Sequence, residues 1–195
     1  MQPLARPLKD DAPAVDSCFL LANINTFSFD YFVRQKVTGN HLSVYIIEQL
    51  PFVTQKYATT ELASLGGLDG IAKRVLELTF TSYDMAGFAE ELGYRGAPFR
   101  WDAQRRALVR AELDAAFFHL YGLAEEDVDY VMDTFPIVKR RDGERFGNYR
   151  TKTLILDAYR KMADAIATGV PYETILDPPP ADPRVAHPLH ETVQT

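Results

Sequence analysis

Residues 102–122 read DAQRRALVRAELDAAFFHLYG and carry the clearest helical pattern in the chain. The apolar side chains recur every three or four residues and so share one face: Val109, Leu113, Phe117 and Leu120. Asp102 can cap the start of this helix and Gly122 its end. Burying each large apolar side chain contributes roughly 1.5 to 3 kcal/mol, against about 0.3 kcal/mol for an exposed ion pair, so packing fixes the helix.

Working outward, the same periodicity predicts further helices over 16–36, 68–80, 84–91, 123–135 and 148–168. The run LSVYII, residues 42–47, is short and rich in β-branched and aromatic residues, and Pro51 would stop it, which predicts a short β element near residues 42–53. Six prolines between 171 and 188 exclude further helix and predict an extended tail that wraps a surface. The expected fold class is therefore mainly α, with a short β element and an extended proline-rich C-terminal tail.

These patterns divide the chain into four parts. We expect an extended lead-in over 1–15, a first segment over 16–80, a helical block over 82–169 and the proline-rich tail over 170–195. The chain has 195 residues, of which 47% are hydrophobic and 25% charged, as in ordinary globular proteins. No apolar stretch approaches the length of a membrane span and none reads as a signal peptide, so we expect a cytoplasmic protein with no membrane contact. The single cysteine, Cys18, is expected to be a small buried hydrophobe.

The charge distribution is uneven. The chain carries −6 overall, whereas residues 139–152, KRRDGERFGNYRTK, hold six Lys or Arg against two acids. We call this stretch the basic segment; its local charge is +4, so the other 181 residues carry −10. Two interpretations are open: a solvated loop whose arginines pair with nearby acids, or a surface that neutralises phosphates.

Motifs for chemistry are missing from the sequence. The glycines at 66, 67 and 70 have neither Rossmann nor P-loop spacing, and no lysine has an acid two positions before it, as common restriction nucleases require. His187 and His190 form the only close histidine pair and have no cysteine partner. Asp177-Pro178-Pro179 resembles the start of an amino-methyltransferase motif, but a proline stands where the stacking aromatic belongs. The sequence therefore assigns no catalytic, cofactor-binding or metal-binding residue.

Several longer stretches resemble one protein family. Residues 20–53, LLANINTFSFDYFVRQKVTGNHLSVYIIEQLPFV, are similar to the target-recognition region of bacterial adenine-specific DNA methyltransferases of the type IIG-like restriction-modification kind. Three further stretches are similar to the C-terminal region of the same group: LELTFTSYDMAGFAEELGY, PFRWDAQRRALVRAELDAAFFHLYG and DTFPIVKRRDGERFGNYRTKTLILDAY. The closing LDPPPADPRVAHP is similar too, so the resemblance covers about residues 17–188.

This resemblance implies a DNA-recognition portion that lacks the catalytic core. Family members bind S-adenosylmethionine and methylate adenine through motifs upstream of this region, so that cofactor is expected elsewhere, in the same gene product or a separate subunit. The expected partners are double-stranded DNA and that catalytic region. The candidate DNA-binding residues lie in two groups: Arg34, Gln35, Lys36, Asn40 and His41, and in the basic segment Lys139, Arg140, Arg141, Arg145, Arg150 and Lys152.

Two alternatives stay open at this point. The chain is either this DNA-recognition module or a protein-interaction module that docks onto another subunit without touching DNA. Whether it has any enzymatic activity of its own is uncertain, and detectable S-adenosylmethionine binding would favour a small autonomous enzyme. Phe99 and Trp101, in the segment PFRW, are expected to be core anchors, with stacking on a base as the alternative.

Overall fold

The structure is a computed structural model that describes residues 13–37, 39, 42–54, 63, 64 and 66–188. Helices dominate this part of the chain, which confirms the mainly α prediction. The helices are α1 (Ala14–Ile24), α2 (Phe27–Lys36), α3 (Val44–Ile47), α5 (Gly67–Thr79), α6 (Ala86–Glu91), α7 (Ala103–Leu120), α8 (Glu125–Asp133), α9 (Pro136–Phe146) and α10 (Arg150–Thr168). Short 3-10 turns occur at η1 (Tyr83–Met85) and η2 (Pro183–Val185).

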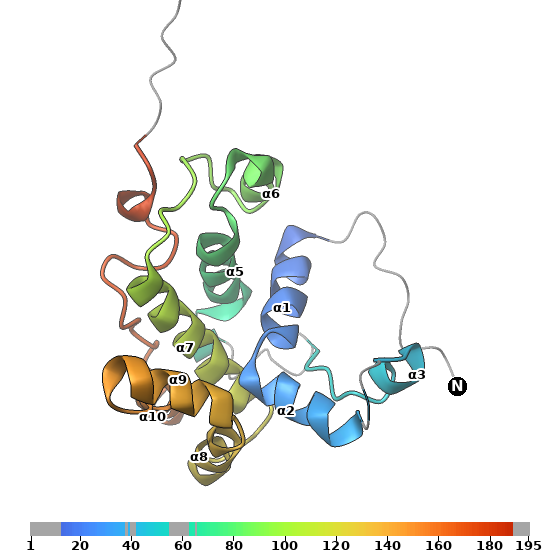
Figure 1. Ribbon diagram of the computed structural model, residues 1–195. Coiled ribbons are helices and arrows are strands. Elements are labelled where there is room, and N and C mark those ends of the chain that lie inside the picture. The colour runs from blue at the N-terminus through green and yellow to red at the C-terminus, as the bar shows by residue number, and fades with distance from the viewer. Residues whose placement is uncertain (1–12, 38, 40–41, 55–62, 65, 189–195) are drawn as a thin grey trace, which may run out of the picture.

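Helix α7 lies in the middle of the molecule and contributes most to the core (Figure 1). Its start is capped by Asp102, whose carboxylate accepts hydrogen bonds from the N–H groups of Gln104 and Arg105. The main core cluster joins α7 to α1, α5, α8 and α10, and includes Phe117, Phe118 and Ile155, none of which has exposed surface. Residues of both expected segments, 16–80 and 82–169, therefore share one core.

Residues 172–186 of the proline-rich tail contact the helices, and Pro183–Val185 form a 3-10 turn within the stretch where further helix was not expected. Glu112 of α7, which has no exposed surface, accepts hydrogen bonds from Tyr172, Thr174 and Ile175 of the tail and from Arg74 of α5. Further along, the N–H of Ala181 donates to Glu77, and a single β-bridge pairs Ala186 with Phe99. Two buried glutamates thus fix the tail to α5 and α7.

The prediction of a β element near residues 42–53 is wrong. Val44–Ile47 form the short helix α3, because the Ser43 side chain accepts a hydrogen bond from the Ile46 N–H and starts a helical turn. A strand also needs a partner strand to satisfy its backbone groups, and the described residues contain only the isolated bridge between Phe99 and Ala186.

Two further expectations change in detail. The single helix expected over 16–36 is two helices, α1 and α2, separated at Asn25 and Thr26. The basic segment is not a loop: most of it belongs to α9, which begins at Pro136 and ends before Gly147. None of the helices in the described residues combines the length and the apolar character that crossing a bilayer requires.

Candidate nucleic-acid interface and adjoining cleft

Four arginines of the basic segment lie on α9 and at the start of α10. We call Arg140, Arg141, Arg145 and Arg150 the arginine patch. Arg141 and Arg145 are one helical turn apart and so share a face of α9. Gly147 has a φ of 77°, which a side chain disfavours, and this left-handed residue turns the chain so that Arg150 begins the next helix beside α9.

Of the two acids of the basic segment, only Glu144 forms an ion pair with a patch arginine among the described residues. Asp142 is buried and its carboxylate accepts the N–H of Thr151, so it caps the start of α10. Glu144 lies 3.8 Å from Arg140, and both side chains are 70% exposed. Within the described part of the chain Arg141, Arg145 and Arg150 form no ion pair. Arg145 and Arg150 instead lie over the ring of Phe146, at 5.1 and 4.7 Å from its centroid.

The two lysines of the same segment behave differently. Lys152 contacts Asp129 at 2.7 Å and Asp133 at 3.0 Å, and Lys139 contacts Asp133 at 3.1 Å. Burial opposes the charge of Lys152, but hydrogen bonds to the two aspartates outweigh it and raise its pKa. The same lysines lower the pKa of Asp133. Two lysines facing two aspartates leave no net charge, so Lys139 and Lys152 contribute less to a phosphate-binding surface than the arginines.

The second predicted group lies at the end of α2. Arg34 pairs with Asp30 at 2.6 Å, and its guanidinium stacks over Phe135, the residue before α9, at 4.3 Å. The structure therefore brings Arg34 next to the start of α9. Gln35 and Lys36 are exposed at the end of the same helix. Asn40 and His41 lie outside the described residues.

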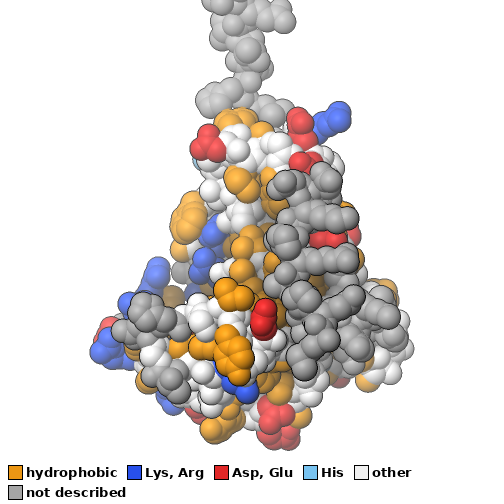
Figure 2. Space-filling model, turned by 90° about the vertical axis from the view of Figure 1, so that its right-hand side faces the viewer, with side chains coloured by type: hydrophobic (Ala, Val, Ile, Leu, Met, Phe, Trp, Pro, Cys, Tyr) orange, Lys and Arg blue, Asp and Glu red, His pale blue; other side chains and the backbone are white. Residues whose placement is uncertain are grey.

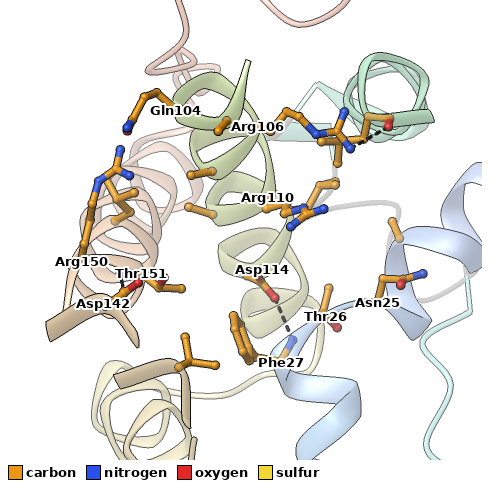
Figure 3. Close-up of a pocket in the computed structure, with 18 of the residues that line it drawn as sticks. Asn25, Thr26, Phe27, Gln104, Arg106, Arg110, Asp114, Asp142, Arg150 and Thr151 are labelled. Carbon is orange, nitrogen blue, oxygen red and sulfur yellow. Dashed lines mark hydrogen bonds between the residues drawn. The ribbon is translucent and has the colours of Figure 1, made fainter. Parts of the chain in front are cut away.

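A cleft of about 680 Å³ adjoins the arginine patch. It lies between α1, α2, α5, α7, α9 and α10, and Figure 3 shows Arg106 and Arg110 of α7 on one side and Asp142 and Arg150 on the other. Arg145 also lines it. In the space-filling view, Lys and Arg side chains gather on the left-hand side of the molecule (Figure 2). The cleft and the patch thus form one continuous region rich in arginine.

Arg106 is the most deeply buried of the arginines that line the cleft, with 8% of its surface exposed. Its Nη2 donates to the carbonyl of Leu78 at 2.9 Å, and Trp101 covers its guanidinium with the ring centroid 3.8 Å from Cζ. Trp101 itself is 68% exposed, whereas Phe99 is 1% exposed and belongs to the smaller core cluster. The prediction of a core anchor is therefore right for Phe99 and wrong for Trp101, which is exposed and packs on Arg106.

Asp114 lies deeper in the cleft and has an unusual protonation equilibrium. Burial raises its pKa to about 7, although the N–H of Phe27, which donates to it at 2.8 Å, and the charge of Arg110 both favour the ionised form. Phe27 is the first residue of α2, so this hydrogen bond ties α2 to α7 (Figure 3). The raised pKa favours the neutral form of Asp114, which weakens its ability to cancel the charge of Arg110.

Other chemistry-bearing residues do not converge. Among the described residues no group of three or more His, Cys, Asp or Glu side chains is placed to hold a metal ion. His190 lies outside the described residues. His119 stacks on Tyr159 with centroids 3.8 Å apart and its Nε2 contacts the Tyr159 carbonyl, which is a structural role.

Comparison of the chain with models of known protein families, with curated proteins and with solved structures found no match. The residues that sequence reasoning missed are Arg106, Arg110 and Asp114. Their spacing of four residues along one face of α7 was visible in the sequence, but a polar stripe on a helix usually faces solvent. Only the packing of α5, α9 and α10 around that stripe makes it the wall of a cleft.

Proposed function

We propose that the chain is a DNA-recognition module that contacts the phosphate backbone of double-stranded DNA through the arginine patch. The observation that carries the proposal is that Arg141, Arg145 and Arg150 on α9 and α10 form no ion pair with any residue that the structure describes, in a chain whose net charge is −6. Because the rest of the chain is acidic, this surface concentrates positive potential on one side of the molecule, and such a potential attracts an anionic partner.

The spacing of the patch suits a nucleic-acid backbone. Arg141 and Arg145 are about 6 Å apart along the helix axis, at 1.5 Å per residue. Phosphates of one DNA strand repeat about every 3.4 Å along its axis, so two arginines one turn apart can contact phosphates two steps apart. Arg150 extends the same surface beyond the corner at Gly147. Guanidinium groups bind phosphate oxygens in pairs, which favours arginine over lysine for this contact.

The wider context of the proposal rests on the sequence resemblance. On that basis the module belongs to an adenine-specific DNA methyltransferase of a restriction-modification system. The catalytic region that binds S-adenosylmethionine then lies elsewhere in the gene product or in a separate subunit. The arginine patch would hold the duplex while that region modifies adenine.

The test is duplex binding measured by fluorescence anisotropy at low salt. A variant carrying Arg141→Gln, Arg145→Gln and Arg150→Gln should bind a duplex of about 20 base pairs much more weakly than the native chain. A matched control carries Lys73→Gln, Arg95→Gln and Lys161→Gln, which removes the same charge from exposed positions outside the patch. Equal weakening in both variants, or no duplex binding by the native chain with or without a catalytic partner, would refute the proposal.

A second candidate function has an observation of its own. The region around α3 exposes large apolar side chains, with Leu42 at 49%, Val44 at 67%, Tyr45 at 74% and Phe52 at 36% exposure. The side of the molecule that carries α3 faces the viewer in Figure 2, where hydrophobic side chains reach the surface. Clustered exposed apolar residues mark protein interfaces, so α3 is a candidate docking site for a catalytic subunit.

Docking through α3 can be tested independently of DNA binding. Val44→Lys with Tyr45→Lys should abolish co-purification with a catalytic subunit while leaving duplex affinity unchanged. An unchanged association would exclude α3 as the docking site.

A further inference from the structure

Arg106 keeps two hydrogen-bond donors without a partner inside the protein. Its Nη2 donates to the Leu78 carbonyl, but Nε and Nη1 are buried and make no hydrogen bond within the described residues. A guanidinium stays charged in proteins, and a buried charged donor that lacks an acceptor is among the costlier features a fold can contain. This side chain lines the cleft, which points to an acceptor that comes from outside the chain.

Arg110 lies one helical turn further along the same face of α7 and also lines the cleft. It is exposed and forms no ion pair in the part of the chain that the structure describes. After burial, the charge of Arg110 is the next factor that lowers the pKa of Arg106, and the charge of Glu77 offsets part of this shift. Two guanidinium groups that repel each other in one cleft are both stabilised by a single anion placed between them.

The surrounding space fits more than a small ion. A volume of about 680 Å³ lies within the range of roughly 300 to 1,000 Å³ that is usual for small-molecule sites. Leu21, Val75 and Leu78 supply apolar wall, and Asn25 and Gln104 supply polar groups on either side of it. Such a lining suits a ligand with an anionic end and a flat, partly polar body.

We propose that Arg106 and Arg110 bind the phosphate group of a nucleotide in this cleft, beside Trp101, whose ring covers the Arg106 guanidinium. A free nucleotide and a nucleotide within a DNA strand carry the same phosphate chemistry, and both can supply it. The proposed phosphate contact uses Arg106 and Arg110, which are not arginine-patch residues, although Arg145 and Arg150 of the patch also line the cleft. Arg140 and Arg141 do not line it, so variants at Arg110 and at Arg141 test the two proposals separately.

The chain has one tryptophan, Trp101, so its emission reports directly on this site. In the experiment, inorganic phosphate, adenosine monophosphate and a short DNA duplex are titrated separately into the protein. Sodium chloride at matched ionic strength is the blank. Phosphate and the nucleotide should change the emission saturably, with the nucleotide binding more tightly because it also contacts the apolar wall. Sodium chloride should have no saturable effect.

Substitutions then test whether the change in Trp101 emission depends on the arginines of α7. Arg110 is exposed, so Arg110→Gln should fold normally and raise the Kd for the nucleotide about tenfold or more, since it removes a charge-assisted hydrogen bond. Arg95→Gln removes an exposed arginine outside the cleft and should leave the Kd unchanged. In ¹⁵N spectra of the arginine side chains, the Nε–H of Arg106 should shift on saturation, because that proton gains an acceptor.

The outcomes separate the possible sources and the two proposals. A saturable response to duplex alone, abolished in Arg110→Gln, supports a phosphate site that is filled from a DNA strand. No saturable response to phosphate, nucleotide or duplex, together with an unmoved Arg106 Nε–H, would overturn the site, as would equal nucleotide affinity in Arg110→Gln. Arg141→Gln should weaken duplex binding without changing the nucleotide Kd, so a failure of the arginine patch and a failure of the cleft give different results.

Discussion

Glu112 shows at the scale of one residue how a charge can be buried at tolerable cost. It has no exposed surface, and its carboxylate is satisfied by Arg74 at 2.8 Å together with Tyr172, Thr174 and Ile175 of the tail. We predict that Glu112→Gln lowers the free energy of unfolding by about 3 to 5 kcal/mol, because Arg74 is left buried without its counter-charge. Urea-induced unfolding of the native chain and of Glu112→Gln measures this difference in the free energy of unfolding. Asp69→Asn, which breaks the exposed pair with Lys73, is the control and should change stability little.

The raised pKa of Asp114 predicts that the stability of the fold depends on pH. Its pKa in the folded protein is about 7, above the usual value near 3.9 in an unfolded chain. Between these values the folded state binds the proton more tightly, so this group favours folding at low pH, and that advantage disappears as the pH rises towards 7. Asp114→Asn keeps an acceptor for the Phe27 N–H but cannot ionise.

We therefore expect Asp114→Asn to raise the melting temperature clearly at about pH 8 and only slightly at about pH 4.5. Thermal unfolding of both proteins at the two pH values measures the difference. A gain of the same size at both would mean that Asp114 does not carry the raised pKa.

At the scale of elements, the division between α1 and α2 depends on Thr26. Its hydroxyl donates to the Asn23 carbonyl at 2.8 Å and accepts the Phe29 N–H at 3.4 Å, so it closes one helix and caps the next. We predict that Thr26→Ala costs about 1 to 2 kcal/mol of stability, whereas Thr26→Ser, which retains the hydroxyl, costs much less. Chemical denaturation of the two variants compares them; equal losses would show that the methyl group and not the cap matters.

The same region shows why some elements were predictable and others were not. The helix over 102–120 was visible because its cap at Asp102, its glycine at 122 and its apolar spacing all agree locally. The break at Thr26 was hidden because the apolar spacing continues from α1 into α2. The residues of α3 are β-branched or aromatic and favour a strand by propensity. The described residues offer them no partner strand, so the Ser43 cap decides.

The candidate site was predictable only in its exposed part. The arginine patch is a local excess of charge in the sequence, so Arg140, Arg141, Arg145 and Arg150 could be named in advance. The pairing of Lys139 and Lys152 with Asp129 and Asp133 depends on how α8, α9 and α10 pack, and no local pattern reports it. The cleft at Arg106 and Arg110 likewise needs six helices to assemble before it exists.

At the scale of the whole molecule, one helical body presents two arginine-rich features with different proposed roles. The arginine patch is mostly exposed and can follow a phosphate backbone, whereas Arg106 and Arg110 line an adjoining cleft of small-molecule size. The acidic remainder of the chain repels DNA elsewhere and should restrict contact to this side. Duplex binding should therefore be electrostatic and oriented.

The most direct measurement is the dependence of duplex affinity on salt concentration. Plotted as log K against log salt concentration, the native chain should give a steep negative slope. Removing Arg141, Arg145 and Arg150 together should reduce the magnitude of that slope by about three, because each arginine neutralises about one phosphate. The matched control at Lys73, Arg95 and Lys161 should keep the native slope. A slope that the patch variant shares with the native chain would contradict the assignment of this surface to DNA.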